Sequence, residues 1–367
     1  MTGGAGFIGS HLVDALVKRG HRVRILDSIV EQVHGNDVPE YLNVEAEFVR
    51  ADICDAEAVA KALDGIEVVY HEAAEVGVGQ SMYEIVRYIK ANDLGTGVLL
   101  EEMLKRKEQF KKLIVASSMS IYGEGAYSCS GCDNTVNPVL RSDEQLAAHK
   151  WDFTCGKCGG ALGPIGTNEE KPLFPTSVYA VSKQDQEQYC LAVGRAYKIP
   201  TVALRYFNVY GTRQALSNPY TGVCAIFSSR LKNNQAPMIF EDGEQSRDFV
   251  HVSDIVRANL LALEFDGGDY QAMNIGTGRA TSVKEIAQLL AKGLAKDIEP
   301  QAVGKYREGD IRHCVADITK ARRLLSYTPK VDLETGLVEL LDWVSKQEAE
   351  DRVQAATAEL SAHSLVK

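Results

Sequence analysis

Short apolar runs and longer amphipathic stretches alternate over residues 1–120. The short runs are rich in β-branched residues and predict strands at residues 22–26, 46–49, 67–70 and 112–116. The longer stretches predict helices at residues 56–63 and 82–107. Strands that alternate with helices are typical of βαβ units, in which the strands lie side by side in a parallel sheet. The pattern therefore predicts an α/β fold.

The alternation stops at residues 127–165, which carry four cysteines and several glycines and show little periodicity. We interpret this segment as an insertion. Beyond it the pattern predicts further helices and strands, at residues 178–197, 201–204, 238–240, 255–263 and 283–295. Residues 346–367 are polar and rich in Ala and Glu, which predicts a helical tail.

Charge and hydropathy narrow the choice of partners. The net charge of −10 argues against nucleic acid, because phosphate backbones attract basic surfaces. No apolar run reaches the roughly 20 residues of a membrane-spanning helix, and residues 1–4 lack the charged and apolar regions of a signal peptide. We therefore expect a cytoplasmic protein that binds neither nucleic acid nor a membrane.

A glycine-rich loop stands at the start of the chain. Its residues, in a G-x-x-G-x-x-G pattern, are Gly3, Gly6, Phe7, Ile8 and Gly9. Glycines permit a tight turn and let backbone N–H groups approach a pyrophosphate, and the N-terminus of the helix that follows attracts the anion. Such a loop normally follows a buried strand, but only two residues precede it here. We expect the native N-terminus to extend upstream and supply that strand.

Acidic residues follow two of the predicted strands. Asp27 ends the first strand, where a carboxylate can bind both hydroxyls of an adenosine ribose. The carboxylate would repel a 2′-phosphate, and Ser28 and Ile29 offer no arginine to bind one. The loop and this acid therefore predict NAD rather than NADP. Asp52 and Ile53 are expected beside the adenine, although a plain loop acid is an equal alternative.

A tyrosine and a lysine share one face of the predicted helix at residues 178–197. Tyr179 and Lys183 have the i, i+4 spacing that places both side chains together. A lysine cation beside a phenol favours the phenolate, so Tyr179 could act as a general base. Ser118, after the strand at 112–116, could hold a substrate hydroxyl. Alone, such a pair is more often a surface pair; after a dinucleotide loop it predicts a catalytic group.

The four cysteines of the insertion form two C-x-x-C pairs. Cys129 and Cys132 make the first pair, and Cys155 and Cys158 make the second. Two such knuckles can place four thiolates tetrahedrally around Zn2+, and four ligands leave no open position for catalysis. We predict a structural zinc site, with four free loop cysteines as the alternative. Because the insertion lies between Ser118 and Tyr179 in the sequence, we also expect it to form a wall or lid over the substrate.

Several segments in fixed order resemble one known family. The segments TGGAGFIG, SSMSIYG, YAVSK and RYFNVYG, together with Asp27, are similar to the extended short-chain dehydrogenase/reductase family, in its nucleotide-sugar epimerase/dehydratase branch. The resemblance covers nearly the whole chain outside the insertion and the tail. It implies a Rossmann-type doubly wound parallel sheet, a smaller C-terminal substrate-binding lobe and a homodimer.

The resemblance also implies ligands and site residues. It implies bound NAD, a nucleotide-diphosphate sugar as the substrate, and Ser118, Tyr179 and Lys183 as the catalytic triad. The further cofactor residues that it implies are Ala73, Ala74 and Asn92, together with Tyr179 and Lys183 of the triad. The substrate residues that it implies are Asn208, Arg213, Arg247, Arg307, Asp310 and Cys314. The expected division is an NAD-binding domain at 1–126 and 166–210, the insertion at 127–165, a lobe mainly for the nucleotide sugar at 211–345 and the tail at 346–367.

The residues after Ser118 decide between the reactions of this family. Relatives that catalyse 4,6-dehydration carry an Asp-Glu pair there, whereas this chain has Met119 and Ser120. Neither side chain can shuttle a proton at neutral pH. We therefore predict 4-epimerisation with tightly bound NAD, which needs only the base and the cofactor. A 4,6-dehydratase and an NAD(P)-dependent reductase of nucleotide sugars are the alternatives, and a non-catalytic NAD-sensing scaffold is a remote one.

The substrate is predicted from resemblance alone. The insertion and the segments EVGVGQSMYEI and RQALSNPYTGV resemble a zinc-knuckle subgroup associated with dTDP-L-rhamnose 4-epimerases. We therefore favour dTDP-L-rhamnose or a related dTDP- or UDP-hexose. UDP-glucose, UDP-N-acetylhexosamine and UDP-glucuronate stay open.

Overall fold

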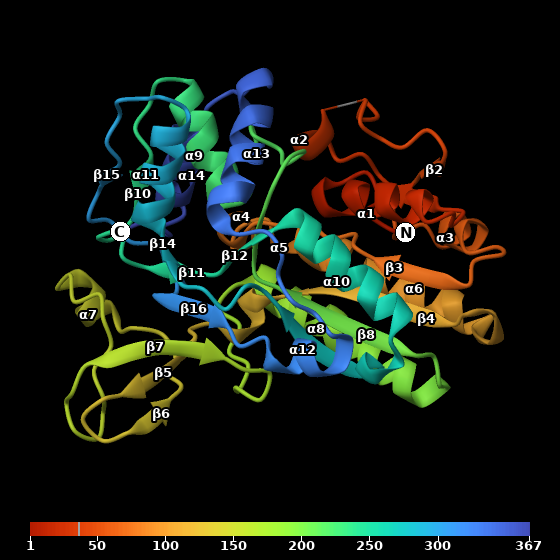
Figure 1. The fold of residues 1–367 in the computed structure, drawn as a ribbon, viewed down its shortest axis with the longest axis horizontal. Helices are drawn as coiled ribbons and strands as arrows, with labels where there is room; N and C mark the ends of the chain where they lie inside the picture. Colours follow the sequence, from red (N-terminus) through yellow and green to blue (C-terminus); the bar gives the residue numbers. More distant parts are fainter. Residues whose placement is uncertain (36) are drawn as a thin grey trace.

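A parallel sheet forms the centre of the computed structural model, which describes residues 1–35 and 37–367 (Figure 1). Its four-stranded part has the order β13-β8-β4-β3, with bounds Gln271–Ile275, Thr201–Tyr206, Lys112–Ser118 and Val68–His71. Its two-stranded part pairs β1 (Arg24–Asp27) with β2 (Glu47–Arg50), also in parallel. Thr2 forms parallel bridges to both Leu26 and His71, and so lies where the strand before the glycine loop was expected. The predicted strands of residues 1–120 are confirmed.

Helices cover both faces of this sheet. On one face lie α1 (Phe7–Lys18), α10 (Val252–Glu264) and α12 (Thr319–Leu325). On the other lie α3 (Ala56–Ala62), α6 (Gly95–Leu104) and α8 (Val178–Tyr197). Side chains alternate along a strand, so Ile114 of β4 faces the first set and Leu113 faces the second. Both faces are buried, as a doubly wound parallel sheet requires.

The predicted helix at 82–107 is divided in the structure. Its parts are α5 (Ile85–Tyr88), the π-helix η1 (Ile89–Leu94) and α6, and α4 (Val78–Ser81) precedes them. A π-turn leaves carbonyl groups without their usual partners. Here the Thr96 hydroxyl donates to the Asn92 carbonyl, and the Cys54 thiol lies 3.1 Å from the Lys90 carbonyl oxygen. A side-chain hydrogen bond within the helix and a contact from Cys54 outside it, which periodicity does not reveal, therefore support the interruption.

A second core lies among three helices of the C-terminal region, shown at the upper left of Figure 1. The helices are α9 (Val223–Lys232), α11 (Val283–Gly293) and α13 (Leu333–Lys346). Two short parallel pairs accompany them, β9 (Asn208–Tyr210) with β12 (Phe249–His251) and β10 (Met238–Ile239) with β15 (Gln301–Ala302). Three elements assigned to this lobe from the sequence, α10, α12 and β13, belong instead with the central sheet. The reason is that the alternate side chains Met273 and Ile275 of β13 are buried beside β8.

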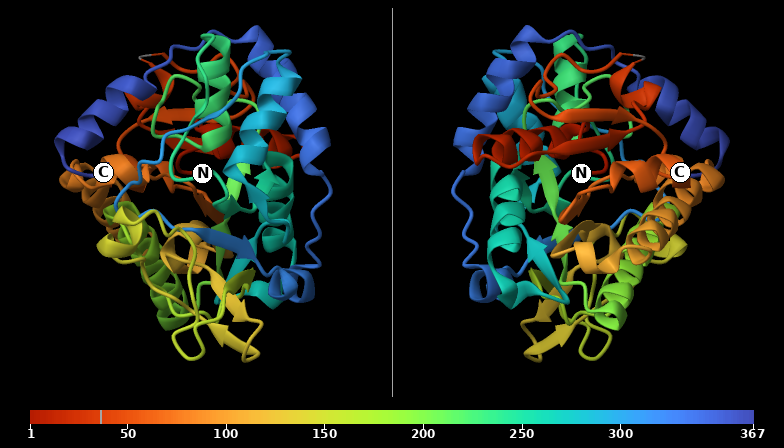
Figure 2. Two further views of the ribbon diagram at one scale, coloured as in Figure 1. Left: turned by 90° about the vertical axis from the view of Figure 1, so that its left-hand side faces the viewer. Right: turned by 90° about the vertical axis from the view of Figure 1, so that its right-hand side faces the viewer.

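The insertion extends a sheet rather than forming an irregular loop. A six-stranded sheet has the order β14-β11-β16-β7-β5-β6, with bounds Thr281–Ser282, Ser246–Arg247, His313–Ala316, Leu162–Thr167, Ala126–Cys129 and Asn134–Val136. The insertion supplies its last three strands and the short helix α7 (Asp143–Ala147). In both views of Figure 2 its yellow strands lie at the bottom of the molecule, far from the blue helix α13.

The remaining elements are short, except for the helix of the tail. The short ones are α2 (Glu31–His34) and the 3-10 helices η2 (Lys107–Gln109), η3 (Met119–Tyr122) and η4 (Asp266–Gly268). The predicted helical tail contains α14 (Val353–Ala362), after which Val366 forms an antiparallel bridge with Arg307. Across the part of the chain that the structure describes, no helix has the length and apolar character needed to span a membrane.

Candidate active site

A cavity of about 920 Å³ lies at the carboxyl ends of the parallel strands. Ligands of open α/β sheets bind at this edge, in cavities of roughly 300–1,000 Å³. One end of the cavity, here called the glycine end, is lined by the glycine loop and Asp27. The other end, here called the arginine end, is lined by Arg247, Arg307 and Asp310. Ser118, Tyr179 and Lys183 line the same cavity.

Backbone geometry explains the glycines of the loop. Gly3 has a positive φ of 68°, and a Cβ there would lie 2.6 Å from the Ala73 backbone nitrogen. A Cβ on Gly9 would collide with the Gly3 carbonyl oxygen. Gly6 is the N-cap of α1, and neither a side-chain cap nor a first-turn acid occupies this helix end. The first N–H groups of α1 are therefore free to bind an anion.

Asp27 connects the loop to the end of β1. One carboxylate oxygen accepts the Ala5 N–H at 3.0 Å, and the other accepts the Ile29 N–H at 3.0 Å. Both bonds orient the carboxylate at the cavity wall. Asp52, Ile53, Ala73 and Ala74 also line the cavity.

Ser118 and Tyr179 meet at the centre of the cavity. Ser118 ends β4, and its oxygen accepts the Ser120 hydroxyl at 2.9 Å and the Ser120 N–H at 3.2 Å. The two bonds from Ser120 do not use the hydroxyl hydrogen of Ser118, which Ser118 donates to the Tyr179 oxygen. Burial raises the pKa of Tyr179, and a hydrogen bond with Ser118 partly offsets this.

Lys183 is buried next to Tyr179 on α8. Its ammonium group donates to the Ala116 carbonyl and, at 2.7 Å, to the side-chain oxygen of Gln186. Burial lowers the pKa of Lys183 to about 8, and the negative charge of Glu72 opposes this shift. At neutral pH the lysine is therefore mostly protonated, as a cation that stabilises a phenolate must be.

Glu72 is a cavity residue that the sequence reasoning missed. It directly follows β3, and its carboxylate accepts the Tyr206 hydroxyl at 2.8 Å. Burial raises the pKa of Glu72 to about 7, although Tyr206 and Lys183 both favour the charged form. The signal was available, because an acid directly after a buried parallel strand lies at the edge where ligands bind.

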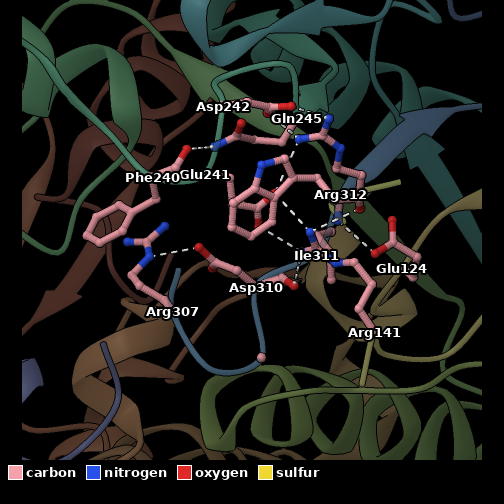
Figure 3. A network of polar contacts seen from close by, with 12 residues as sticks. Glu124, Arg141, Phe240, Glu241, Asp242, Gln245, Arg307, Asp310, Ile311 and Arg312 are labelled. Atoms are coloured by element: carbon pink, nitrogen blue, oxygen red, sulfur yellow. Dashed lines mark hydrogen bonds and ion pairs between the residues drawn. The ribbon is translucent and has the colours of Figure 1, made fainter. Parts of the chain in front are cut away.

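The arginine end brings together residues that are distant in sequence (Figure 3). Arg307 donates to the Asp310 carboxylate at 2.8 Å and stacks on the Phe240 ring, with 4.8 Å to its centroid. Arg247 donates to three backbone carbonyls that include Ile311, at 2.7 Å. Asn208 also lines the cavity, and its side-chain oxygen is buried without a hydrogen-bond partner among the described residues. The guanidinium groups of Arg247 and Arg307 and the unpartnered oxygen of Asn208 suit a phosphorylated polar ligand.

Asn92, an expected cofactor residue, does not line the cavity. It lies in η1, fully buried, and donates to the Ser182 hydroxyl at 2.9 Å. Its side-chain oxygen accepts the Glu75 N–H at 2.7 Å. Asn92 therefore connects α8 to the cavity wall at Glu75, because the π-turn directs its side chain between these elements.

Two expected substrate residues also lie outside the cavity wall. Arg213 has a positive φ of 66°, pairs with Asp14 at 2.8 Å and stands over the Tyr41 ring at 5.1 Å. Cys314 is buried within β16, and its sulfur lies 3.9 Å from the Thr167 hydroxyl. Strand pairing turns Cys314 into the core, and a left-handed backbone turns Arg213 toward α1.

The four cysteines of the insertion converge, but not on the cavity. Their sulfur atoms lie within 4.8 Å of one another, with 3.7 Å between Cys132 and Cys155 and 3.4 Å between Cys129 and Cys158. No described residue of 127–165 lines the cavity. The expected wall or lid over the substrate is therefore wrong, because β5 and β7 carry the insertion away from the sheet edge.

Instead, α14 of the tail covers part of the cavity, which the sequence did not predict. The residues of α14 that line the cavity are Val353, Ala356, Thr357 and Leu360. The His363 ring stacks on Tyr83 with 4.6 Å between centroids, and the Tyr83 hydroxyl lies 2.6 Å from that of Tyr220. The alternation of Ala and Glu in the tail indicated a helix but not the surface that it covers.

Comparisons with known proteins agree with this site. The chain matches the NAD dependent epimerase/dehydratase family over residues 1–151 and 154–276. It is 36% identical over 351 residues to the dTDP-L-rhamnose 4-epimerase of Burkholderia thailandensis, covering 95% of this chain and 94% of that protein.

Solved structures give the same result. The UDP-glucose 4-epimerase of Thermotoga maritima with UDP-glucose is 35% identical, with a TM-score of 0.76 over 94% of this chain and 97% of that one. The UDP-glucuronic acid 4-epimerase of Bacillus cereus, in complex with UDP-glucuronic acid and NAD, is 29% identical, with a TM-score of 0.77 over 94% and 98%. The chain therefore belongs to the NAD dependent epimerase/dehydratase family, the branch of the short-chain dehydrogenases/reductases that its motifs resemble.

Proposed function

We propose that the protein is an NAD-dependent nucleotide-sugar 4-epimerase. One observation carries the proposal: a single cavity joins the glycine loop, the group formed by Ser118, Tyr179 and Lys183, and the arginine end. This order matches the order of the parts that such a reaction needs, which are dinucleotide, sugar and nucleotide diphosphate.

The residues of the glycine end fit NAD. The uncapped N-terminus of α1 suits the pyrophosphate, and the oriented carboxylate of Asp27 suits the adenosine ribose hydroxyls. Bound NAD would supply reversible acceptance of a hydride from C4 of the sugar. We propose that the residues at this end include Gly3, Gly6, Phe7, Ile8, Gly9, Asp27, Asp52, Ile53, Ala73 and Ala74.

The protein's own groups manage the proton. We propose that Tyr179 takes the proton of the C4 hydroxyl, with Lys183, one turn further along α8, as the cation that favours the phenolate. The hydroxyl hydrogen of Ser118, which the two bonds from Ser120 do not use, holds the sugar oxygen when the substrate is bound. Burial excludes water from this group and strengthens each of these interactions. After the 4-keto sugar turns over in the cavity, Tyr179 returns the proton.

The neighbours of Ser118 disfavour dehydration. Met119 is buried and apolar, and Ser120 is bonded to Ser118. Loss of water across two carbons needs an added acid and base, and neither side chain titrates near neutral pH. Glu72, whose charge acts on Lys183, is not one of the residues that follow Ser118, and its carboxylate already accepts the Tyr206 hydroxyl at 2.8 Å.

We propose dTDP-L-rhamnose, or a related dTDP- or UDP-hexose, as the substrate. Arg247 and Arg307 would bind the diphosphate, with Asn208 and Asp310 beside them. The relative from Burkholderia thailandensis supports the choice of sugar. The test is to incubate purified protein with a panel of dTDP- and UDP-sugars without added cofactor and to follow the configuration at C4 by NMR. A 4-keto-6-deoxy product without an epimer, or net consumption of added NADH, would overturn the proposal.

We further infer that the four cysteines hold Zn2+. A tetrahedral zinc with bonds of about 2.3 Å places its sulfurs about 3.8 Å apart, close to the distances observed here. Because such thiols must stay reduced, we assign the protein to the cytoplasm. Metal analysis of protein purified without added zinc tests the site.

We also infer a homodimer. Exposed apolar side chains gather on α5, η1 and α8, which contact one another; they include Val86, Ile89, Leu94, Val181 and Tyr189. Exposed apolar surface of this kind marks protein interfaces. Light scattering on the purified protein tests this.

We keep the division of the chain predicted from sequence, with α10, α12 and β13 moved to the NAD-binding domain.

A further inference from the structure

The insertion contacts the arginine end of the cavity from behind. None of its described residues lines the cavity, yet Arg141 of the insertion reaches the two segments that carry Phe240 and Arg307 (Figure 3). Its side chain is 1% exposed. Burial of an unpaired charge destabilises a protein, so a buried cation must be fully paired. Attachment of the insertion alone does not explain why Arg141 is placed at this position.

Arg141 binds both segments at once. It forms a two-pronged ion pair with the Glu241 carboxylate, at 2.8 Å for each nitrogen. It also donates to the Asp310 backbone carbonyl at 3.0 Å and to the Trp151 carbonyl at 3.3 Å. Glu241 directly follows Phe240, and the Asp310 carboxylate holds Arg307. One side chain therefore fixes the backbone on both sides of the Phe240–Arg307 stack.

The backbone at Glu241 explains why this support is needed. Glu241 has a positive φ of 56°, in the left-handed region that side chains with a Cβ rarely adopt. Arg312 provides a second ion pair to the same carboxylate, at 3.2 Å, and binds Asp242 at 2.6 Å. The turn after Phe240 is thus held by two buried cations, of which only Arg141 belongs to the insertion.

We propose that Arg141 is a positioning residue for the nucleotide end of the substrate, through which the cysteine-held insertion sets the affinity for the nucleotide sugar. Arg141 touches neither substrate nor cofactor; it holds Phe240 and Arg307 in the geometry that receives the nucleotide diphosphate. This inference rests on the proposed function for the identity of the ligand at the arginine end.

The test compares Arg141→Met with Arg141→Lys and with Lys112→Met in the full-length protein. Lys112 is the matched control, because it is a buried cation paired with Asp266 and Asp269. It begins β4, about 20 Å from Ser118 at the other end of that strand. All three variants are expected to have a lower melting temperature, since each disturbs a buried ion pair.

The expected result is a selective loss of affinity. Arg141→Met should raise KM for the nucleotide sugar about tenfold, with kcat and NAD content within about twofold of the parent. Calorimetry with UDP and dTDP should show the same loss. Arg141→Lys, which keeps the charge but not the fork, should show an intermediate loss, and it replaces the Met variant if that one does not fold. Lys112→Met should leave KM unchanged.

A double variant separates positioning from general stability. If Arg141 acts through the stack, adding Phe240→Ala to Arg141→Met should cost less than the product of the two single effects. An unchanged KM in a folded Arg141 variant, a loss equal to that of Lys112→Met, or fully multiplicative effects would each overturn the inference. If the parent protein itself converts no nucleotide sugar, the proposed function fails instead. Binding of UDP and dTDP still tests Arg141 in that case.

Discussion

The two ends of the cavity are built in different ways. At the glycine end, the loop residues come from one short continuous segment, Gly3 to Gly9, and at the adjoining centre Tyr179 and Lys183 lie one helix turn apart. At the arginine end, contacts join residues far apart in sequence. Arg141 is 100 residues from Glu241 and 169 from Asp310. One end is organised locally and the other by tertiary structure.

This difference predicts how each end responds to substitution. Locally organised residues contact the ligand directly, so changing one removes a chemical function without moving its neighbours. Residues that meet across long sequence separations support each other, so a change at the arginine end spreads through shared partners such as Glu241. Substitutions at the centre should therefore alter kcat, and those at the arginine end should alter KM.

The largest effect is expected at the centre. Tyr179→Phe removes the proposed base while keeping the ring, so kcat should fall by about 10²–10⁴-fold. NAD content and the affinity for UDP and dTDP should stay close to those of the parent, because neither depends on the hydroxyl. Rates come from NMR of the C4 epimers, and affinities come from calorimetry. A Tyr179→Phe variant with more than a tenth of the parent rate would show that another group is the base.

Arg307→Met should have the next largest effect. The guanidinium is a proposed diphosphate ligand, and charge-assisted hydrogen bonds contribute about 1.5–3 kcal/mol each. Since the side chain is 41% exposed, we expect the lower part of the corresponding range, an increase in KM of about 10-fold to 30-fold. NAD content should not change. Initial rates over a range of substrate concentrations separate KM from kcat, and an equal loss in kcat would contradict the division between the two ends.

What the sequence revealed follows the same division. The alternation of apolar runs predicted β1 to β4, and helix periodicity predicted the bounds of α8, because both patterns are local. Spacing also placed Tyr179 and Lys183 on one face of that helix. The strands of the insertion were missed because β7 is stabilised by pairing with β16, which is distant in sequence.

Three residues predicted for the site do not line the cavity, and they have one feature in common. Asn92, Arg213 and Cys314 were assigned by resemblance, but the direction of a side chain depends on the backbone that carries it. A π-turn, a positive φ and strand pairing turn these three side chains away from the cavity. Leu360 was missed for the converse reason, because nothing in the tail indicates which surface the helix covers.

Glu72→Gln tests the electrostatics at the centre and should have a smaller effect. Activity requires protonated Lys183, whose pKa is about 8, so the rate should fall as pH rises through 8. The Glu72 carboxylate raises the pKa of Lys183, so its removal should lower that pKa and move the fall to lower pH by up to about one unit. The measurement is the pH dependence of kcat. A shift to higher pH would contradict the attraction between Glu72 and Lys183.

The smallest effect is expected from Leu360→Ala, which examines whether the two ends are independent. Leu360 lines the cavity from α14, and a Cβ on Gly79 would lie 3.1 Å from it. Beyond this helix, Val366 bridges to Arg307, so the tail touches the cavity wall both at α4 and at the arginine end. Removing the side chain should open the cover without moving either set of ligands. We expect KM to rise about twofold to threefold, with kcat unchanged.

The same opening should hasten the exchange of bound NAD with labelled NAD, whereas Arg141→Met should affect the nucleotide sugar alone. Gln354→Ala, on the exposed side of α14, is the matched control and should change neither property. If Leu360→Ala alters KM but not NAD exchange, the tail serves the arginine end only. If it alters both, the tail covers both ends of the cavity, although the two ends are otherwise folded separately and bind their ligands separately.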